Sequence, residues 1–137
     1  MMQLEWTEKT PVYGDIIRTK VRFYHHYGIF VSESQVVQFG LPDDPMRPAE
    51  DVKVLVSDIY TFLQGGDLEV AVPDRATAKK MRKPKEIVEI AMSRVGEGGY
   101  DILHNNCEHF VNDCAFGVAS SSFLQELRGK LRKKLGK

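Results

Sequence analysis

Cys107 is the side chain best suited to covalent chemistry in this sequence of 137 residues. It follows Asn105 and Asn106, and asparagine is a favoured N-cap, so the pattern predicts a helix that begins at the cysteine. The first backbone N–H groups of a helix have no intrahelical partner and lie at the positive end of its dipole. They favour the reactive thiolate and can hold the oxyanion of an acyl-transfer intermediate. We interpret Cys107 as a nucleophile, the alternative being a buried cysteine that only packs.

Four histidines are candidates for the base that a cysteine nucleophile requires. His109 lies two residues beyond Cys107, a rotation of about 200° on a helix, so we expect its ring to point away from the thiol. His104 precedes the helix and is expected to cap or turn the chain. The remaining candidates, His25 and His26, are neighbours in a predicted strand.

Side-chain alternation along that strand, residues 24–31, separates the two candidates. Three residues form the expected core face: Tyr27, Ile29 and Val31. His25 shares their parity, whereas His26 has the opposite parity and lies near Gly28, which leaves room beside it. If the helix that carries Cys107 packs on the face of His26, this histidine reaches the thiol and is the general base.

Gln38 is the expected partner that orients His26. It lies in a predicted strand over residues 35–40, and a hairpin with the preceding strand would bring it beside the histidine. Its amide oxygen can accept the imidazole N–H and select the tautomer, although an amide cannot stabilise imidazolium as a carboxylate does. The alternative is an exposed or edge glutamine.

Other patterns predict the elements that position these residues. Strands are expected at 14–20, 52–56 and 68–72, a short helix capped by Ser57–Asp58 is expected to end at Phe62, and a longer helix is expected at 84–95. The segment 73–83 is polar, basic and expected to be exposed. The proline-rich loop 41–50 and the basic segment 75–85 are candidates to shape the substrate site.

Composition and charge exclude several classes of function. The formal net charge is zero, so the overall charge gives no reason to expect nucleic acid as a partner. The sequence starts without the pattern of a signal peptide, and no apolar run approaches the roughly 20 residues of a membrane span, so a cytoplasmic protein is expected. The Cα atoms of Cys107 and Cys114 would lie about 10.5 Å apart on one helix, too far for a disulfide. Both cysteines are therefore expected to be free thiols, as in a reducing compartment. We expect no cofactor and no metal.

The last residues, 123–137, form a separate segment after a single predicted domain at 1–122. Leucines recur there at helical spacing, and basic residues surround them: Arg128, Lys130, Arg132, Lys133 and Lys134. Such a helix either packs its leucines on the domain or makes peripheral contact with an anionic membrane surface. Nucleic acid is less favoured because no aromatic residues are interleaved with the charges.

Two segments, His26–Val31 and Asn105–Val111, resemble the signatures of the lecithin:retinol acyltransferase family, which includes the small phospholipase/acyltransferases of the H-Ras-like suppressor group. The resemblance extends over roughly residues 10–128. It implies an α+β fold of the circularly permuted papain-like type, related to the NlpC/P60 superfamily, with an antiparallel sheet packed on the cysteine helix. It also implies that Cys107 is the nucleophile, that His26 is the general base and acid, and that the substrate is a lipid ester with a phospholipid-like acyl donor.

The position of Gln38 usually holds a second histidine in animal members of the family, so this chain departs from the pattern there. The implied mechanism is ping-pong: Cys107 attacks an ester carbonyl, His26 protonates the leaving alcohol, and water or an acyl acceptor resolves the thioester. Animal members continue into a membrane-spanning helix, whereas the basic segment here leads us to expect peripheral contact.

Three other hypotheses remain. A cysteine peptidase or isopeptidase of a related papain-like group would use the same chemistry on a different acyl donor. A non-catalytic binding module could keep the same fold. A metal site could use four nearby side chains, His104, Cys107, His109 and Cys114, although their spacing matches no zinc-finger pattern.

Overall fold

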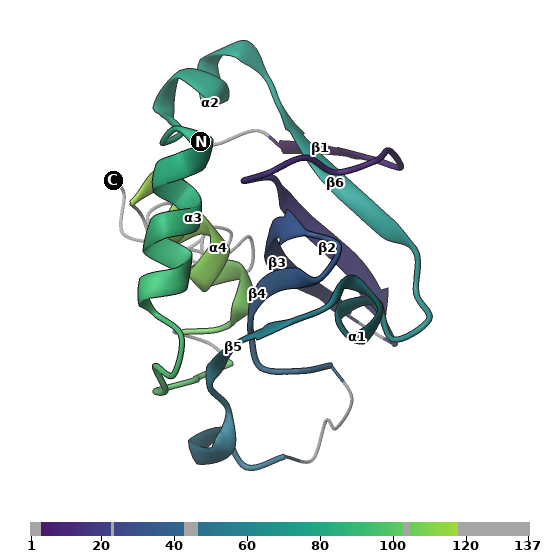
Figure 1. The fold of residues 1–137 in the computed structure, drawn as a ribbon, viewed down its shortest axis with the longest axis vertical. Helices are drawn as coiled ribbons and strands as arrows, with labels where there is room; N and C mark the ends of the chain where they lie inside the picture. Colours follow the sequence, from purple (N-terminus) through teal and green to yellow (C-terminus); the bar gives the residue numbers. More distant parts are fainter. Residues whose placement is uncertain (1–3, 23, 43–46, 103–104, 118–137) are drawn as a thin grey trace, which may run out of the picture.

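The computed structural model describes residues 4–22, 24–42, 47–102 and 105–117. Within these ranges, six strands form one antiparallel sheet in the order β1-β6-β2-β3-β4-β5 (Figure 1). The strands are β1 (Leu4–Thr7), β2 (Ile16–Val21), β3 (Tyr24–Ser32), β4 (Gln35–Phe39), β5 (Val54–Ser57) and β6 (Leu68–Pro73). The helices are the 3₁₀ turn η1 (Ala49–Asp51), α1 (Ile59–Leu63), α2 (Arg75–Lys80), α3 (Pro84–Ser93) and α4 (Cys107–Phe116). This arrangement confirms the predicted α+β class.

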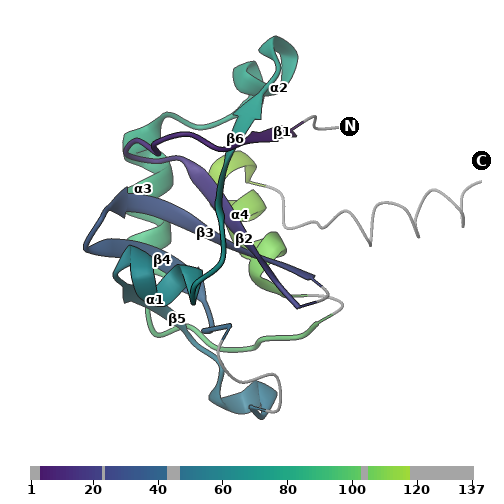
Figure 2. The ribbon, with the colours of Figure 1, turned by 90° about the vertical axis from the view of Figure 1, so that its right-hand side faces the viewer.

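Both faces of the sheet are buried. On one face, α3 and α4 pack on side chains that include Ile16, Ile29 and Val37 (Figure 1). Helix α1 lies on the other face (Figure 2), and its Phe62 packs in a second cluster that includes Ile17. Successive strand residues point to opposite faces, so the consecutive isoleucines of β2 supply one side chain to each cluster. The two clusters explain why consecutive residues of the central strands, such as Ile16 and Ile17 or Val36 and Val37, are both apolar instead of alternating with polar residues.

The hairpin of β3 and β4 forms as expected and sets the register of the candidate site. The strands pair Ile29 with Val37 and Gly28 with Gln38, and a tight turn at Glu33–Ser34 joins them. Gly28 and Gln38 therefore share a face, and His26, two residues before Gly28, lies on that same face.

Strand β1, helix α2 and the 3₁₀ turn η1 were not predicted, and one helix is shorter than predicted. Strand β1 was missed; it forms one edge of the sheet and pairs with β6. The segment expected to be merely exposed and basic contains α2, whose N-cap Asp74 accepts a hydrogen bond from the Thr77 N–H at 2.7 Å. Helix α3 ends at Ser93 rather than near residue 95, because the Gly96 N–H donates to the Val54 carbonyl and draws the chain towards β5.

Gly28 makes room for Phe62 of α1, and replacing it is expected to destabilise the fold. A Cβ at this position would lie 2.7 Å from Phe62 Cε1 and 3.2 Å from the Val37 carbonyl oxygen. We expect Gly28→Ala to lower the free energy of unfolding by about 1–3 kcal/mol, the usual cost of overpacking. Urea denaturation measures this loss. The double variant Gly28→Ala/Phe62→Leu should lose less than the two single losses combined, whereas full additivity would contradict the proposed clash.

No helix within the described ranges is both long enough and apolar enough to cross a bilayer. The predicted basic helix at 123–137 lies outside the described residues, and so does His104.

Candidate active site

Helix α4 begins at Cys107, as predicted, and Asn106 is its N-cap. The Asn106 Oδ1 accepts hydrogen bonds from the backbone N–H groups of Glu108 and His109, both at 3.0 Å. In return, the His109 Nδ1 accepts the Asn106 N–H at 3.0 Å, which completes a capping box. His109 is thus engaged with the start of its own helix, consistent with the expectation that it is structural.

The Cys107 thiol is buried beneath the first turn of α4, with only 6% of the residue exposed. Burial raises the pKa of this thiol to about 11, and the nearby Glu108 carboxylate adds to the rise. Backbone N–H groups, including that of Tyr27 in β3, favour the thiolate but do not outweigh burial. The helix start favours the thiolate as expected, but desolvation outweighs this effect, so the pKa of the thiol is raised.

His26 lies beneath the sheet surface, with 3% of the residue exposed. Its ring packs against Phe62 at a centroid distance of 5.2 Å, and its Nε2 lies 2.7 Å from the Gln38 Oε1. Burial lowers the pKa of His26 to about 4, against a smaller opposing effect of the Gln38 hydrogen bond. The imidazole is therefore neutral at neutral pH, as a general base must be. The predicted proximity of Gln38 to His26 is confirmed.

The relation between α4 and His26 differs from the prediction. Helix α4 packs on the face of Ile29 and Val37, whereas His26 and Gln38 share the face covered by Phe62. The predicted arrangement, with α4 on the face of His26, is therefore wrong. Both faces of β3 are apolar, so the sequence pattern could not choose between them.

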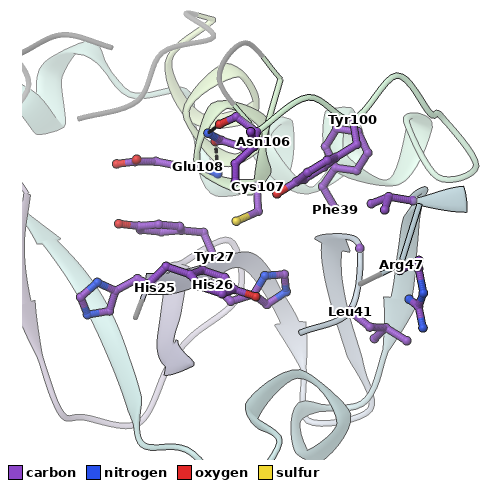
Figure 3. Close-up of a pocket in the computed structure, with 14 residues that line it drawn as sticks. His25, His26, Tyr27, Phe39, Leu41, Arg47, Tyr100, Asn106, Cys107 and Glu108 are labelled. Atoms are coloured by element: carbon purple, nitrogen blue, oxygen red, sulfur yellow. Dashed lines mark hydrogen bonds between the residues drawn. The ribbon is translucent and has the colours of Figure 1, made fainter. Parts of the chain in front are cut away.

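One pocket at the end of the hairpin is nevertheless lined by residues from both faces of β3. The pairing of β3 with β4 stops at Gly28 and Gln38, so residues 24–27 pair only with β2, and a gap opens where β4 ends. A pocket of about 430 Å³ occupies this region, and both Cys107 and His26 line it. Figure 3 shows the sulfur of Cys107 directed towards the part of β3 that carries Tyr27 and His26.

The remaining wall of the pocket is largely apolar. It is formed chiefly by Phe39, Leu41, Val52, Tyr100 and Ile102. The Tyr100 ring meets Phe39 edge-on at 5.2 Å, and Ile102 is 74% exposed at the rim. Leu41 and Arg47 come from the loop that was expected to shape the site, but no residue of the candidate segment 75–85 lines the pocket. Tyr100 and Ile102 were missed as site residues, because no spacing rule links the loop before α4 to β4.

His25 also lines the pocket but has a different environment from His26. Its side chain is 34% exposed, and its Nε2 lies 3.9 Å from the Glu69 Oε1. Burial and the positive charge of Arg18 lower the pKa of His25, and Glu69 opposes them. Its ionic partner is thus a carboxylate at 3.9 Å, whereas the partner of His26 is an amide at hydrogen-bond distance.

The low pKa of His26 predicts a loss of stability in acid. The unfolded chain binds a proton as the pH falls through 6.5, whereas the folded protein resists protonation until about pH 4. The free energy of unfolding is therefore expected to fall by roughly 3 kcal/mol over this window. Urea titrations at pH 7 and pH 4.5 measure the loss. The variant His26→Asn should lose much less stability between these two pH values, whereas His25→Asn should lose about as much as wild type. Equal losses in wild type and both variants would contradict the assignment of the effect to His26.

A buried cysteine at a helix start and a neutral histidine in the same pocket are the groups expected in an enzyme with a cysteine nucleophile. A family model described as lecithin retinol acyltransferase matches residues 9–120. The chain belongs to this family, as the two sequence signatures implied.

Individual relatives agree with this assignment. The chain is 27% identical over 128 residues to a lecithin retinol acyltransferase of Bos taurus, covering 79% of this chain and 56% of the relative. It is 28% identical over 127 residues to the human phospholipase A and acyltransferase 3, covering 85% of this chain and 78% of the relative. It is 31% identical over 124 residues to the human phospholipase A and acyltransferase 2, covering 81% and 74%. The chain spans little more than half the length of the lecithin retinol acyltransferases it matches.

Proposed function

We propose that this chain is a cysteine-dependent acyl hydrolase or acyltransferase that acts on lipid esters. The observation that carries the proposal is the pocket at the end of the β3–β4 hairpin, which a thiol and a neutral imidazole both line. Relatives named acyltransferase and phospholipase A support this reaction class. The apolar wall, with the exposed Ile102 at its rim, suits an acyl chain better than a polar peptide.

The fold is consistent with a permuted papain-like enzyme. In this chain the histidine strand precedes the cysteine helix, and the helix packs on an antiparallel sheet. We infer that the two catalytic groups meet at the end of the sheet, where β4 leaves β3, rather than across one flat face.

In the proposed first step, the Cys107 sulfur attacks the ester carbonyl carbon while its proton passes to His26. Because the Nε2 of His26 is engaged with Gln38, the proton goes to Nδ1. A neutral thiol and a neutral imidazole start the reaction, so proton transfer accompanies attack instead of preceding it. The imidazolium then protonates the leaving alcohol as the carbon–oxygen bond breaks, and an acyl-thioester on Cys107 remains.

The oxyanion of the tetrahedral intermediate requires backbone donors near the thiol. The N–H groups of Glu108 and His109 already donate to the Asn106 side chain. We therefore assign the Cys107 N–H as the donor from the first turn of α4. Water or an acyl acceptor then attacks the thioester, with His26 again taking a proton, and the free thiol is restored.

Product analysis tests the proposal. Phosphatidylcholine with a different acyl chain at each position is presented in mixed micelles, with and without a lysophospholipid acceptor, and mass spectrometry identifies the products. We expect free fatty acid and lysophospholipid, or acyl transfer to the acceptor. Cleavage of peptide or isopeptide substrates with no ester turnover would instead support the peptidase alternative.

A further inference from the structure

The hydrogen bonds beyond His26 continue past Gln38 into β5. The Gln38 Nε2 donates to the Ser57 Oγ at 2.6 Å, and the Ser57 hydroxyl donates to the Asp58 carbonyl oxygen at 2.9 Å. Ser57 is the last residue of β5 and pairs with Val36, so its side chain shares a face of the sheet with that of Gln38. The chain of hydrogen bonds therefore follows one face of the sheet from the histidine to a backbone carbonyl.

The backbone carbonyl fixes the direction of every hydrogen bond in this chain. A carbonyl oxygen can only accept, so the Ser57 hydroxyl donates its single proton to the Asp58 carbonyl. The same hydroxyl can then only accept from Gln38. The Gln38 amide must then present its NH₂ group to Ser57 and its oxygen to His26. The Nε2 of His26 consequently carries the ring proton, and Nδ1 keeps the lone pair that a base needs.

We propose that Ser57 is a positioning residue that fixes the tautomer of His26 through Gln38. This role rests on the proposed function of His26 as the base. A glutamine can face its neighbour with either its oxygen or its NH₂ group, so it sets a tautomer only when something else sets its own orientation. In a flipped amide, the NH₂ group would donate to Nε2, move the ring proton to Nδ1 and leave no lone pair there for the thiol.

The start of α1 holds the far end of this chain in place. Asp58 is the N-cap of α1, and its Oδ1 accepts the Thr61 N–H at 2.7 Å. The same helix supplies Phe62, which packs against the His26 ring. Helix α1 therefore supports His26 from the face of the sheet opposite α4 in two ways. Phe62 packs against the imidazole ring, and Asp58 fixes the orientation of the Gln38 amide through Ser57.

Nitrogen NMR of histidine-labelled protein tests the proposal directly, because two-bond couplings to the ring carbons' protons distinguish the two neutral tautomers. We expect the wild-type His26 to hold its proton on Nε2. Ser57→Ala should populate the Nδ1–H tautomer and lower kcat by about tenfold with little change in KM. Ser57→Thr keeps the hydroxyl and should restore both readouts. A Ser57→Ala protein that keeps the Nε2–H tautomer would overturn the proposal whatever its activity.

A second background separates positioning from a general structural effect. In Gln38→Glu, both carboxylate oxygens accept hydrogen bonds, so this residue needs no partner to set its orientation. Ser57→Ala should therefore leave the His26 tautomer unchanged in that background, and the same tautomer shift in both backgrounds would overturn the role of Ser57. If ester turnover persists in Cys107→Ala, the proposed function fails, while the tautomer spectra still decide the role of Ser57.

Discussion

Replacing Cys107 by alanine is expected to lower ester turnover by about a thousandfold or more, with the protein still folded. The thiol supplies the only protein atom that forms a bond to the acyl group in the proposed mechanism, so no other side chain replaces it. Burial raises the pKa of the thiol, so the thiol is uncharged at neutral pH. Its removal therefore leaves no buried charge without a partner, and the variant should fold. Initial rates with a phosphatidylcholine or a p-nitrophenyl ester measure the effect.

Cys114 provides the matched control for this experiment. It lies on the same helix, is fully buried, and does not line the pocket. Burial also raises the pKa of Cys114, to about 12. Cys114→Ala should cost stability as a core truncation but should keep turnover within a few-fold of wild type. Equal losses in the two variants would mean that the cysteine effects are structural and that Cys107 is not the nucleophile.

Replacing His26 by asparagine is expected to lower turnover by roughly a hundredfold to a thousandfold, the usual contribution of a positioned general base. The variant loses proton transfer from the thiol, which burial keeps protonated at neutral pH. His25→Asn alters a half-exposed ring of the same pocket and should change turnover by only a few-fold. A greater loss in His25→Asn than in His26→Asn would identify His25 as the base and contradict the assignment to His26.

The pH dependence of turnover follows from the pKa of His26, which burial lowers to about 4. A base must be unprotonated, so kcat/KM should rise as the pH increases through about 4 and then level off. In Gln38→Glu, a carboxylate beside the ring stabilises the imidazolium and raises the pKa of His26. The rising limb should therefore move to higher pH in that variant. A limb that does not move would argue that another group controls it.

The sequence allowed the local geometry of the site to be predicted. Strand alternation placed His26 and Gly28 on one face, and the hairpin placed Gln38 beside them, because both depend only on neighbouring residues and a short turn. The N-cap Asn106 was also predictable, since capping is decided within one turn. The resemblance to the family rested on the segments that carry His26 and Asn106, and the family match over residues 9–120 confirms it.

What the sequence could not predict depends on distant parts of the chain. Ile29 and Phe30 are both buried, on opposite faces of the sheet, so no pattern within β3 indicated which face α4 would cover. The rise in the pKa of the thiol could not be predicted either, because it depends on burial in the folded domain, which outweighs the effect of the helix terminus. Ser57 had been interpreted only as part of a helix cap, since its bond to Gln38 exists only once β4 and β5 pair.

The most direct test of the account is the intact mass of the protein during turnover. Wild type, Cys107→Ala and Cys114→Ala are mixed with short-chain and long-chain phosphatidylcholine, quenched in acid and weighed by mass spectrometry. We predict an added acyl group in wild type and in Cys114→Ala, its absence in Cys107→Ala, and its release by hydroxylamine, as for a thioester. An acyl group that persists in Cys107→Ala, or ester turnover by wild type with no acylated protein at any time, would contradict a covalent intermediate on Cys107.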